Sequence, residues 1–261
     1  MVRSRLEIRY YRQQNLASDA TIASRGPMQL YLRQLLAGRD FGLTNPVAAQ
    51  MQNFVYLVGD RESGECMVVD PAWDVRDIIR VAETDGMKIV GALATHYHPD
   101  HIGGTMFGFT VEGLPTLMEI NPCKVHVHKL ESAGVRQVTA LSKSDLVEHD
   151  SGDRVKIGAV EIELLHTPGH TPGSQCFRLD GALLAGDTLF LQGCGRVDLP
   201  GGDADEMYYT LTQRLRSLPD DMILFPGHAY GGESAPLGEV RQTNSYMTIK
   251  DLATWRRVHG A

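Results

Sequence analysis

The heptapeptide THYHPDH at positions 95–101 places three imidazoles and one carboxylate within six residues. Imidazole nitrogens and carboxylate oxygens are common metal ligands. His96 and His98 lie two positions apart, so in extended backbone both side chains point to the same side. Asp100 and His101 follow Pro99, which turns the chain, and they can therefore aim at a different point. The spacing predicts that this one motif supplies ligands to two neighbouring metal ions.

Three further ligand-type side chains each follow a β-type run, namely His170 in HTPGH, Asp187 in AGDT and His228 in FPGH. With the first motif they make five histidines and two aspartates, which is enough for two metal sites. His166 is an alternative to His170, but the Pro-Gly turn before His170 favours the latter. The candidate ligands are His96, His98, Asp100, His101, His170, Asp187 and His228.

A second His-x-His pair, His126 and His128, lies in another β-type run. No Asp-His pair follows it, and a lone histidine is more often a satisfied structural residue than a ligand. We therefore predict structural roles for both. Cys194 is the thiol nearest to the candidate ligands in sequence, and a structural role is also its ordinary interpretation.

Strand ends must position these ligands. The apolar run at 87–94 follows Gly86 and predicts a buried strand that opens into the histidine motif. In open α/β sheets, ligands bind at that end of a strand. Residues 54–59 and 66–70 predict a hairpin. Apolar residues at helical spacing over 75–82 predict a helix capped by Asp74, so strand, helix and strand lead to the site.

The downstream runs continue this arrangement. Residues 160–164 alternate as a half-buried strand that leads to His170. A hairpin around Asp180-Gly181 leads to Asp187, and the strand at 222–225 leads to His228. Each distal ligand is therefore expected directly after a strand.

Four other segments carry weaker patterns. Residues 29–37 have the apolar spacing of a helix, and Met207 to Leu218 predict another helix. Met106–Pro122 shows no clear period and predicts a packed loop, with a lid over the metal ions as the alternative. The last thirty residues predict one or two short helices that pack through a stripe of Ile249, Leu252 and Trp255.

The pattern THxHxDH, followed by a distal His, a distal Asp and a last His, resembles the metallo-β-lactamase superfamily over about Gln50 to Tyr230. The resemblance implies an α/β fold, the αββα four-layer sandwich, with the site at one rim. It implies that Asp187 bridges two metals. It also implies a first metal on His96, His98 and His170, and a second on Asp100, His101 and His228.

Imidazole and carboxylate ligands without thiolate suit zinc, iron or manganese, and we expect two Zn²⁺ ions, with Fe or Mn as alternatives. Two metals about 3.5–4 Å apart can share a hydroxide and stabilise the attacking and leaving oxygens. The expected nucleophile is therefore metal-bound hydroxide. Asp187 and Asp100 are expected to orient it, which makes both catalytic candidates.

Arg196 and Tyr230 are the candidates for substrate contact. An arginine can hold a carboxylate through two parallel hydrogen bonds. A tyrosine hydroxyl can donate to a developing oxyanion. The ordinary alternatives are a surface ion pair for Arg196 and a packed aromatic ring for Tyr230.

Two subfamilies are similar to this chain. Glyoxalase II, which hydrolyses hydroxyacylglutathione thioesters, shares the ligand set and the GDTLF…GCG stretch. It usually has Lys-x-Tyr after GCG, where this chain has Arg196-Val197-Asp198, and its long helical C-terminal domain is not evident here. Persulfide dioxygenase shares GCGRxD at 193–198 and a short end like 234–244. In that family the matching residues for its one Fe²⁺ are His96, His170 and Asp187.

We therefore predict a metal-dependent hydrolase of thioester or ester substrates, similar to hydroxyacylglutathione hydrolase. The alternative is a mononuclear iron dioxygenase of glutathione persulfide. A second alternative is a metal-binding protein without catalytic activity. The predicted partner is a small-molecule substrate, and a homodimer is compatible with the sequence.

Bulk properties narrow the remaining classes. The chain has 261 residues, and we predict a domain at 28–261 after an N-terminal extension at 1–27. A net charge of −7 without a run of Lys or Arg argues against nucleic acid or an anionic membrane as partner. Four widely spaced cysteines predict no disulfide framework and favour the cytoplasm. No apolar stretch approaches the length of a membrane span, and no signal peptide is expected.

Overall fold

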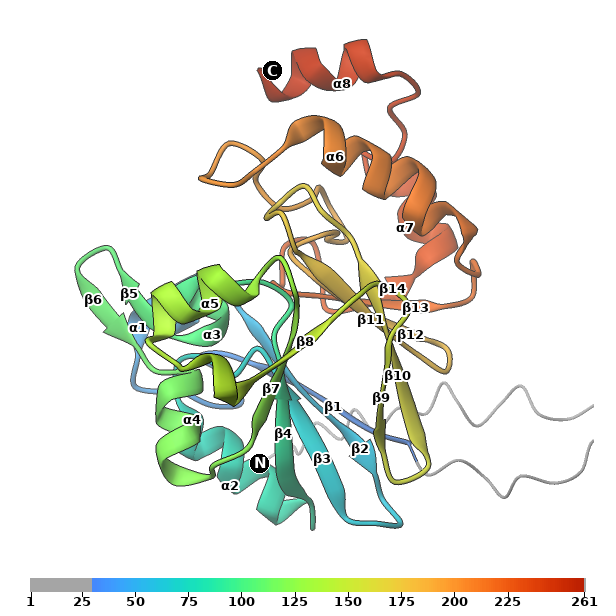
Figure 1. The fold of residues 1–261 in the computed structure, drawn as a ribbon. Helices are drawn as coiled ribbons and strands as arrows, with labels where there is room; N and C mark the ends of the chain where they lie inside the picture. The colour runs from blue at the N-terminus through green and yellow to red at the C-terminus, as the bar shows by residue number, and fades with distance from the viewer. Residues whose placement is uncertain (1–29, 261) are drawn as a thin grey trace, which may run out of the picture.

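Two six-stranded β-sheets pack face to face, with helices on both outer faces (Figure 1). The computed structural model describes residues 30–260. The four-layer αββα sandwich implied by the resemblance is confirmed. The predicted extension at 1–27 lies outside the described residues.

The first sheet has the strand order β1-β2-β3-β4-β7-β8, and its neighbours from β3 to β8 run parallel. The bounds are β1 (Leu30–Leu36), β2 (Phe54–Asp60), β3 (Glu65–Val69), β4 (Lys88–Leu93), β7 (Lys124–His128) and β8 (Leu146–His149). Its outer face is covered by α1 (Pro46–Met51), α2 (Val75–Thr84), α4 (Leu114–Ile120) and α5 (Ser132–Thr139). The short helix α3 (Pro99–Ile102) follows β4.

The second sheet has the order β14-β13-β12-β11-β10-β9 and is antiparallel except for the pair β12 and β13. The bounds are β9 (Arg154–Ile157), β10 (Val160–His166), β11 (Gln175–Leu179), β12 (Ala182–Gly186), β13 (Ile223–Pro226) and β14 (Ala235–Pro236). The helices α6 (Ala204–Tyr209) and α7 (Leu237–Thr243) cover this sheet, and α8 (Leu252–His259) packs on the far side of α6 (Figure 1). A π-helical turn at Thr210–Arg214 and a 3-10 turn at Leu215–Ser217 extend α6.

Side chains alternate along each central strand, so the apolar residues of one strand contribute to two different cores. In β2, Phe54 and Tyr56 face the second sheet, where they join a core that includes Phe177. Val55 and Leu57 point the opposite way and pack beneath the helices. Successive residues of a strand face opposite sides of a sheet, so a fully apolar strand serves two cores. The third core lies between the second sheet and its helices, with Trp255 fully buried in it.

This topology brings several strand ends to one rim. Strands β3, β4 and β7 are parallel, so the segments after them emerge at one edge. Strands β12 and β13 are parallel in the second sheet and end in Gly186 and Pro226. The residues after these ends include the candidate ligands.

Most predicted elements are confirmed, including the hairpin of β2 and β3, the capped helix α2 and the hairpin of β11 and β12. The helical prediction for 29–37 is wrong, because Leu30–Leu36 is a strand paired with β2 along its whole length. Tyr31 and Leu35 face one core while Leu30, Leu32 and Leu36 face the other. Because both faces of this strand carry apolar residues, their spacing in the sequence resembles that of an amphipathic helix.

The packed loop predicted for Met106–Pro122 is also wrong. The segment completes a hairpin of β5 (Gly104–Met106) and β6 (Phe109–Val111) and then forms α4. The side chains of Leu114 and Leu117 on α4 are fully buried in the core between the first sheet and its helices. Elements this short contain too few residues to show a period.

We predict that Phe177→Ala lowers the free energy of unfolding by about 3–5 kcal/mol, because it opens a cavity between the two sheets. Phe177 is fully buried there. Urea unfolding followed by circular dichroism measures the change. Phe107→Ala is the control, since Phe107 is 87% exposed at the tip of the β5–β6 hairpin, and its effect should stay within about 0.5 kcal/mol. Equal losses in both variants would contradict the assigned core.

Candidate metal centre

The seven candidate ligands lie together at the rim where the two sheets meet. His96 and His98 follow β4, and α3 carries Asp100 and His101. Pro99 stands at the start of α3, a position where its missing N–H costs nothing. The other three ligands follow β10, β12 and β13 of the second sheet. Six of the seven side chains are buried, and His98 is partly exposed.

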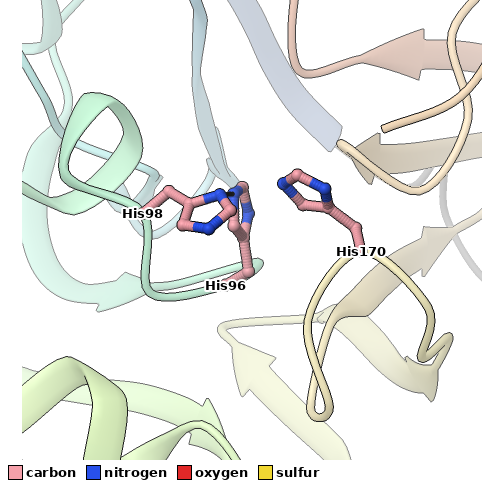
Figure 2. A group of neighbouring side chains, drawn as sticks. All are labelled: His96, His98 and His170. Carbon is pink, nitrogen blue, oxygen red and sulfur yellow. Dashed lines mark hydrogen bonds between the residues drawn. The ribbon is translucent and has the colours of Figure 1, made fainter. Parts of the chain in front are cut away.

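His96, His98 and His170 form the first cluster, and Figure 2 shows their rings gathered around one point. Their ligand atoms lie within 4.8 Å of one another. His96 Nε2 is 3.1 Å from His98 Nδ1. His170 Nε2 is buried and makes no hydrogen bond to any described residue. An unpartnered buried nitrogen is costly, and a bound cation would satisfy it.

Asp100, His101 and His228 form the second cluster. His101 Nε2 and His228 Nε2 are 3.2 Å apart, and each lies 3.5 Å from Asp100 Oδ2. Tetrahedral coordination with bonds of about 2.0–2.1 Å places ligand atoms about 3.3–3.4 Å apart. The gap between these atoms therefore has the size that a metal ion such as zinc requires.

Asp187 lies between the two clusters. Its Oδ2 is 3.6 Å from His170 Nε2 of the first cluster and 3.4 Å from His228 Nε2 of the second. Its Oδ1 lacks a hydrogen bond within residues 30–260 and is 3.3 Å from His101 Nε2. Burial raises the pKa of Asp187, but the imidazoles of His228 and His101 outweigh burial and hold this pKa well below its usual value. The carboxylate is thus ionised and placed to bridge two cations.

Hydrogen bonds at Nδ1 orient four of the five imidazoles. A metal-binding histidine commonly uses its second ring nitrogen in this way. The Nδ1 contacts are His96 to Thr95 Oγ1 (2.9 Å), His101 to Asp70 Oδ2 (3.0 Å), His170 to the Arg196 carbonyl (2.7 Å) and His228 to the Met51 carbonyl (2.8 Å). These four rings therefore present Nε2 to the centre, whereas His98 presents Nδ1.

Asp70 is a supporting residue that the sequence analysis missed. It follows β3 and accepts hydrogen bonds from the Thr95 backbone N–H, the Thr95 hydroxyl and His101 Nδ1. It also lies close enough to His96 and His101 to be a ligand. Because three donors already occupy its oxygens, we infer that Asp70 orients the His101 ring and is not itself a ligand. Its position at the end of the strand beside β4 is the signal that could have identified it.

Asn53 is a second supporting residue that was missed. Its Nδ2 donates to Asp100 Oδ2 at 3.1 Å and lies 3.4 Å from His101 Nε2 and 3.5 Å from His228 Nε2. Its Oδ1 accepts a hydrogen bond from Trp73 Nε1. The indole therefore fixes the amide, and the amide holds the second cluster in place. Asn53 directly precedes β2, far from the motif, and no pattern marks it.

Two glycines are required by close packing around Asp187. A Cβ on Gly195 would lie 2.1 Å from the Asp187 carbonyl oxygen and 2.8 Å from the His170 ring. A Cβ on Gly227 would lie 2.4 Å from Asp187 Oδ1. Gly195 also donates its N–H to the Asp187 carbonyl at 2.8 Å. The second glycine of GCG therefore has a packing role beside two ligands.

The two predicted substrate-contact residues lie at the edge of the centre. The guanidinium of Arg196 binds both oxygens of Asp198, and its side chain is 66% exposed. Tyr230 stacks on His228 with ring centroids 4.7 Å apart, and its hydroxyl donates to the Met51 carbonyl at 3.4 Å. Arg196 thus forms the surface ion pair, and Tyr230 the packed aromatic ring, that were the alternatives to substrate contact. Substrate contact by either residue stays a prediction.

The thiols do not contribute to either cluster. Burial and the charge of Asp187 raise the pKa of Cys194 to about 12, so this thiol is protonated at neutral pH. All four cysteines are free, as the sequence analysis expected. Every helix among the described residues is too short or too polar to span a membrane.

The sequence profile described as "Metallo-beta-lactamase superfamily" matches residues 49–228. Human "Persulfide dioxygenase ETHE1, mitochondrial" is 33% identical over 201 residues, which cover 75% of this chain and 72% of that protein. "Hydroxyacylglutathione hydrolase" of Polaromonas sp. is 36% identical over 183 residues, which cover 69% of this chain and 63% of that protein. The chain is thus similar to proteins named for two different activities.

Two solved structures agree with these relationships. ETHE1 from Myxococcus xanthus is 25% identical, with a TM-score of 0.71 over 88% of this chain and 90% of that chain. The protein TTHA1623, solved in a di-iron-bound form, is 28% identical, with a TM-score of 0.62 over 75% of this chain and 96% of that chain. The second structure associates a similar fold with bound iron.

The histidines predicted to be structural lie outside both clusters. His128 is buried and stacks on His166, with ring centroids 4.0 Å apart and planes 4° from parallel. His126 faces His149, with 2.8 Å between Nδ1 and Nε2. Burial first, and then the charge of His166, lowers the pKa of His128 to about 4. This stack joins β7 of one sheet to β10 of the other.

We predict that His128→Phe makes stability less sensitive to acid. The folded pKa of about 4 lies below the ordinary value of 6.5, so the stabilisation is complete above pH 6.5 and is lost as the pH falls towards 4. Phenylalanine keeps the ring but cannot titrate. Between these values the slope of unfolding free energy against pH should fall by up to about 1.4 kcal/mol per pH unit. Urea unfolding at several pH values tests this, and an unchanged slope would contradict it.

Proposed function

This chain belongs to the metallo-beta-lactamase superfamily, and from its metal centre we propose a metal-dependent hydrolase of thioester or ester substrates. The position of Asp187 carries the proposal. One oxygen of this carboxylate faces both His170 of the first cluster and His228 of the second. A shared carboxylate between two complete ligand sets is suited to two adjacent metals.

The first cluster supports this proposal further. His98 Nδ1 lies beside His96 Nε2 and completes a set of three imidazoles with His170. The second cluster has three ligand-type residues of its own and shares none of them with the first. The donors fit two divalent ions such as Zn²⁺, with Fe or Mn as alternatives. When bound, such ions supply Lewis acidity and lower the pKa of water.

The chain's own residues would hold and orient the reactants. Asp100 and Asp187 would hold the metal ions and orient the attacking water, and Asn53 keeps Asp100 in position. Water adds to the acyl carbon, the carbon–sulfur or carbon–oxygen bond breaks, and the leaving thiol or alcohol takes up a proton. Tyr230 is 40% exposed beside His228 and is our candidate donor to the substrate's acyl oxygen. Arg196 is the candidate partner for a substrate carboxylate.

Persulfide dioxygenase is the second candidate, and the similarity to ETHE1 from Myxococcus xanthus over 88% of this chain and 90% of that chain supports it. The match to the human enzyme covers 75% of this chain and 72% of that protein. His96, His170 and Asp187 form a face of two imidazoles and one carboxylate that fits a single Fe²⁺. For either activity we propose a small-molecule substrate and a cytoplasmic location, with a homodimer as an allowed assembly.

We predict that Asp187→Ala reduces bound Zn²⁺ from two ions per chain to one or fewer. Loss of a supporting residue alone typically costs 10–100-fold in metal affinity or activity, so loss of the bridge should lower thioester hydrolysis at least about 100-fold. Elemental analysis and a thiol-release assay measure both. Asp221→Ala is the matched control, because it removes an exposed carboxylate that belongs to neither cluster. Full metal content and rate in Asp187→Ala would remove Asp187 from this role.

A direct comparison of the two reactions separates the candidates. Protein purified from its native host should contain two zinc ions per chain and release glutathione from a hydroxyacylglutathione thioester without consuming oxygen. Elemental analysis, a thiol assay and an oxygen electrode provide the readouts. One iron per chain, with oxygen uptake on glutathione persulfide and no thioester hydrolysis, would establish the dioxygenase instead.

A further inference from the structure

Glu131 is a fully buried carboxylate between β7 and α5. Its Oε2 accepts a hydrogen bond from the Tyr97 backbone N–H at 2.8 Å. Its Oε1 accepts from the Thr171 hydroxyl at 2.8 Å and from the Gly173 backbone N–H at 2.7 Å. Both oxygens are therefore engaged, and each contacts a different loop.

These two loops carry the whole first cluster. Tyr97 stands between the ligands His96 and His98, and Thr171 directly follows the third ligand, His170. The first loop leaves the first sheet and the second loop leaves the second sheet, and Figure 2 shows their histidines facing each other. A single side chain thus joins the backbones on both sides of one metal position.

The contacts around Glu131 leave little freedom. A Cβ on Gly173 would lie 2.7 Å from the Glu131 backbone nitrogen and 2.9 Å from its Oε1. No Lys or Arg side chain of residues 30–260 forms an ion pair with this carboxylate. Hydrogen-bond donors from the two loops take the place of the water that would otherwise solvate the carboxylate. A buried carboxylate without these donors would be strongly destabilised. The carboxylate and the two loops that donate to it therefore stabilise each other.

We propose that Glu131 is a positioning residue that sets the distance between the two loops of the first metal position. Within residues 30–260 its carboxylate forms no hydrogen bond to the side chain of a candidate ligand, and it acts through the backbone at Tyr97 and Gly173 and the hydroxyl of Thr171. The second cluster has separate supports in Asp70, Asn53 and the Met51 carbonyl. Loss of Glu131 should therefore weaken one metal position and spare the other.

The test compares Glu131→Ala, Glu131→Gln and the control Ser132→Ala. Ser132 is the adjacent buried residue, and its hydroxyl donates to Glu148 rather than to either loop. Titration with Zn²⁺, followed by calorimetry, should show the tighter and weaker sites separately. In Glu131→Ala one site should weaken about 10–100-fold, the usual effect of removing an outer support, while the other keeps its wild-type affinity. Ser132→Ala should keep both.

Glu131→Gln provides a graded change. Its amide oxygen can still accept from Thr171 and Gly173, but its NH₂ group would face the Tyr97 N–H, and two donors cannot bond. We expect the loop at 171–173 to stay ordered and the loop at 95–98 to loosen. Hydrogen exchange of the Tyr97 and Gly173 amides reports this residue by residue. Glu131→Ala should speed exchange at both amides, and Glu131→Gln mainly at Tyr97.

The inference rests on the proposed metal centre but not on which reaction it performs. Hydrogen exchange on metal-free protein measures the order of the two loops directly. It therefore remains informative if neither proposed reaction is found. Two results would overturn the inference. One is wild-type Zn²⁺ affinity at both sites in Glu131→Ala, and the other is unchanged exchange at Tyr97 and Gly173. A lower melting temperature with either result would leave Glu131 a purely structural residue.

Discussion

The hydrogen bond at the second ring nitrogen decides which way a metal-binding histidine faces. In this chain two of these partners are backbone carbonyls, of Met51 and Arg196, and a third is the carboxylate of Asp70. Carbonyls are fixed by the fold, so the direction of each Nε2 follows from where the segments before β2 and after β12 run. The metal centre therefore depends on the sandwich itself and not on the histidine motif alone.

The positions of the candidate ligands were predictable because each follows a strand and the strand signals are local. The spacing of His96 and His98 determines their shared direction, and the turn at Pro99 separates them from Asp100 and His101. The structure places these residues with His170 and His228 in two adjoining clusters, and Asp187 lies between the clusters. The four-layer fold was available from the resemblance and not from the strand pattern, since strand runs alone do not specify how two sheets pair.

The supporting residues were not predictable, because their partners are distant in sequence. Asp70 lies 25 residues from Thr95, Asn53 lies 47 from Asp100, and Glu131 lies 34 from Tyr97. Single buried polar residues carry no periodic signal and become recognisable only when strand order is known. The strand β1 was mistaken for a helix for a related reason. An edge strand with both faces covered loses the alternation that distinguishes it.

Each candidate metal position combines residues from both halves of the sandwich. The first combines His96 and His98 with His170, and the second combines Asp100 and His101 with His228. Bound cations would consequently act as cross-links at the seam between the sheets, alongside the hydrogen bonds from Gln175 to Thr95 and Ala94. Occupancy and folding are then coupled, since a ligand held at 100 times its Kd adds about 2.7 kcal/mol of stability. Metal supply would govern the lifetime of the folded chain as well as its chemistry.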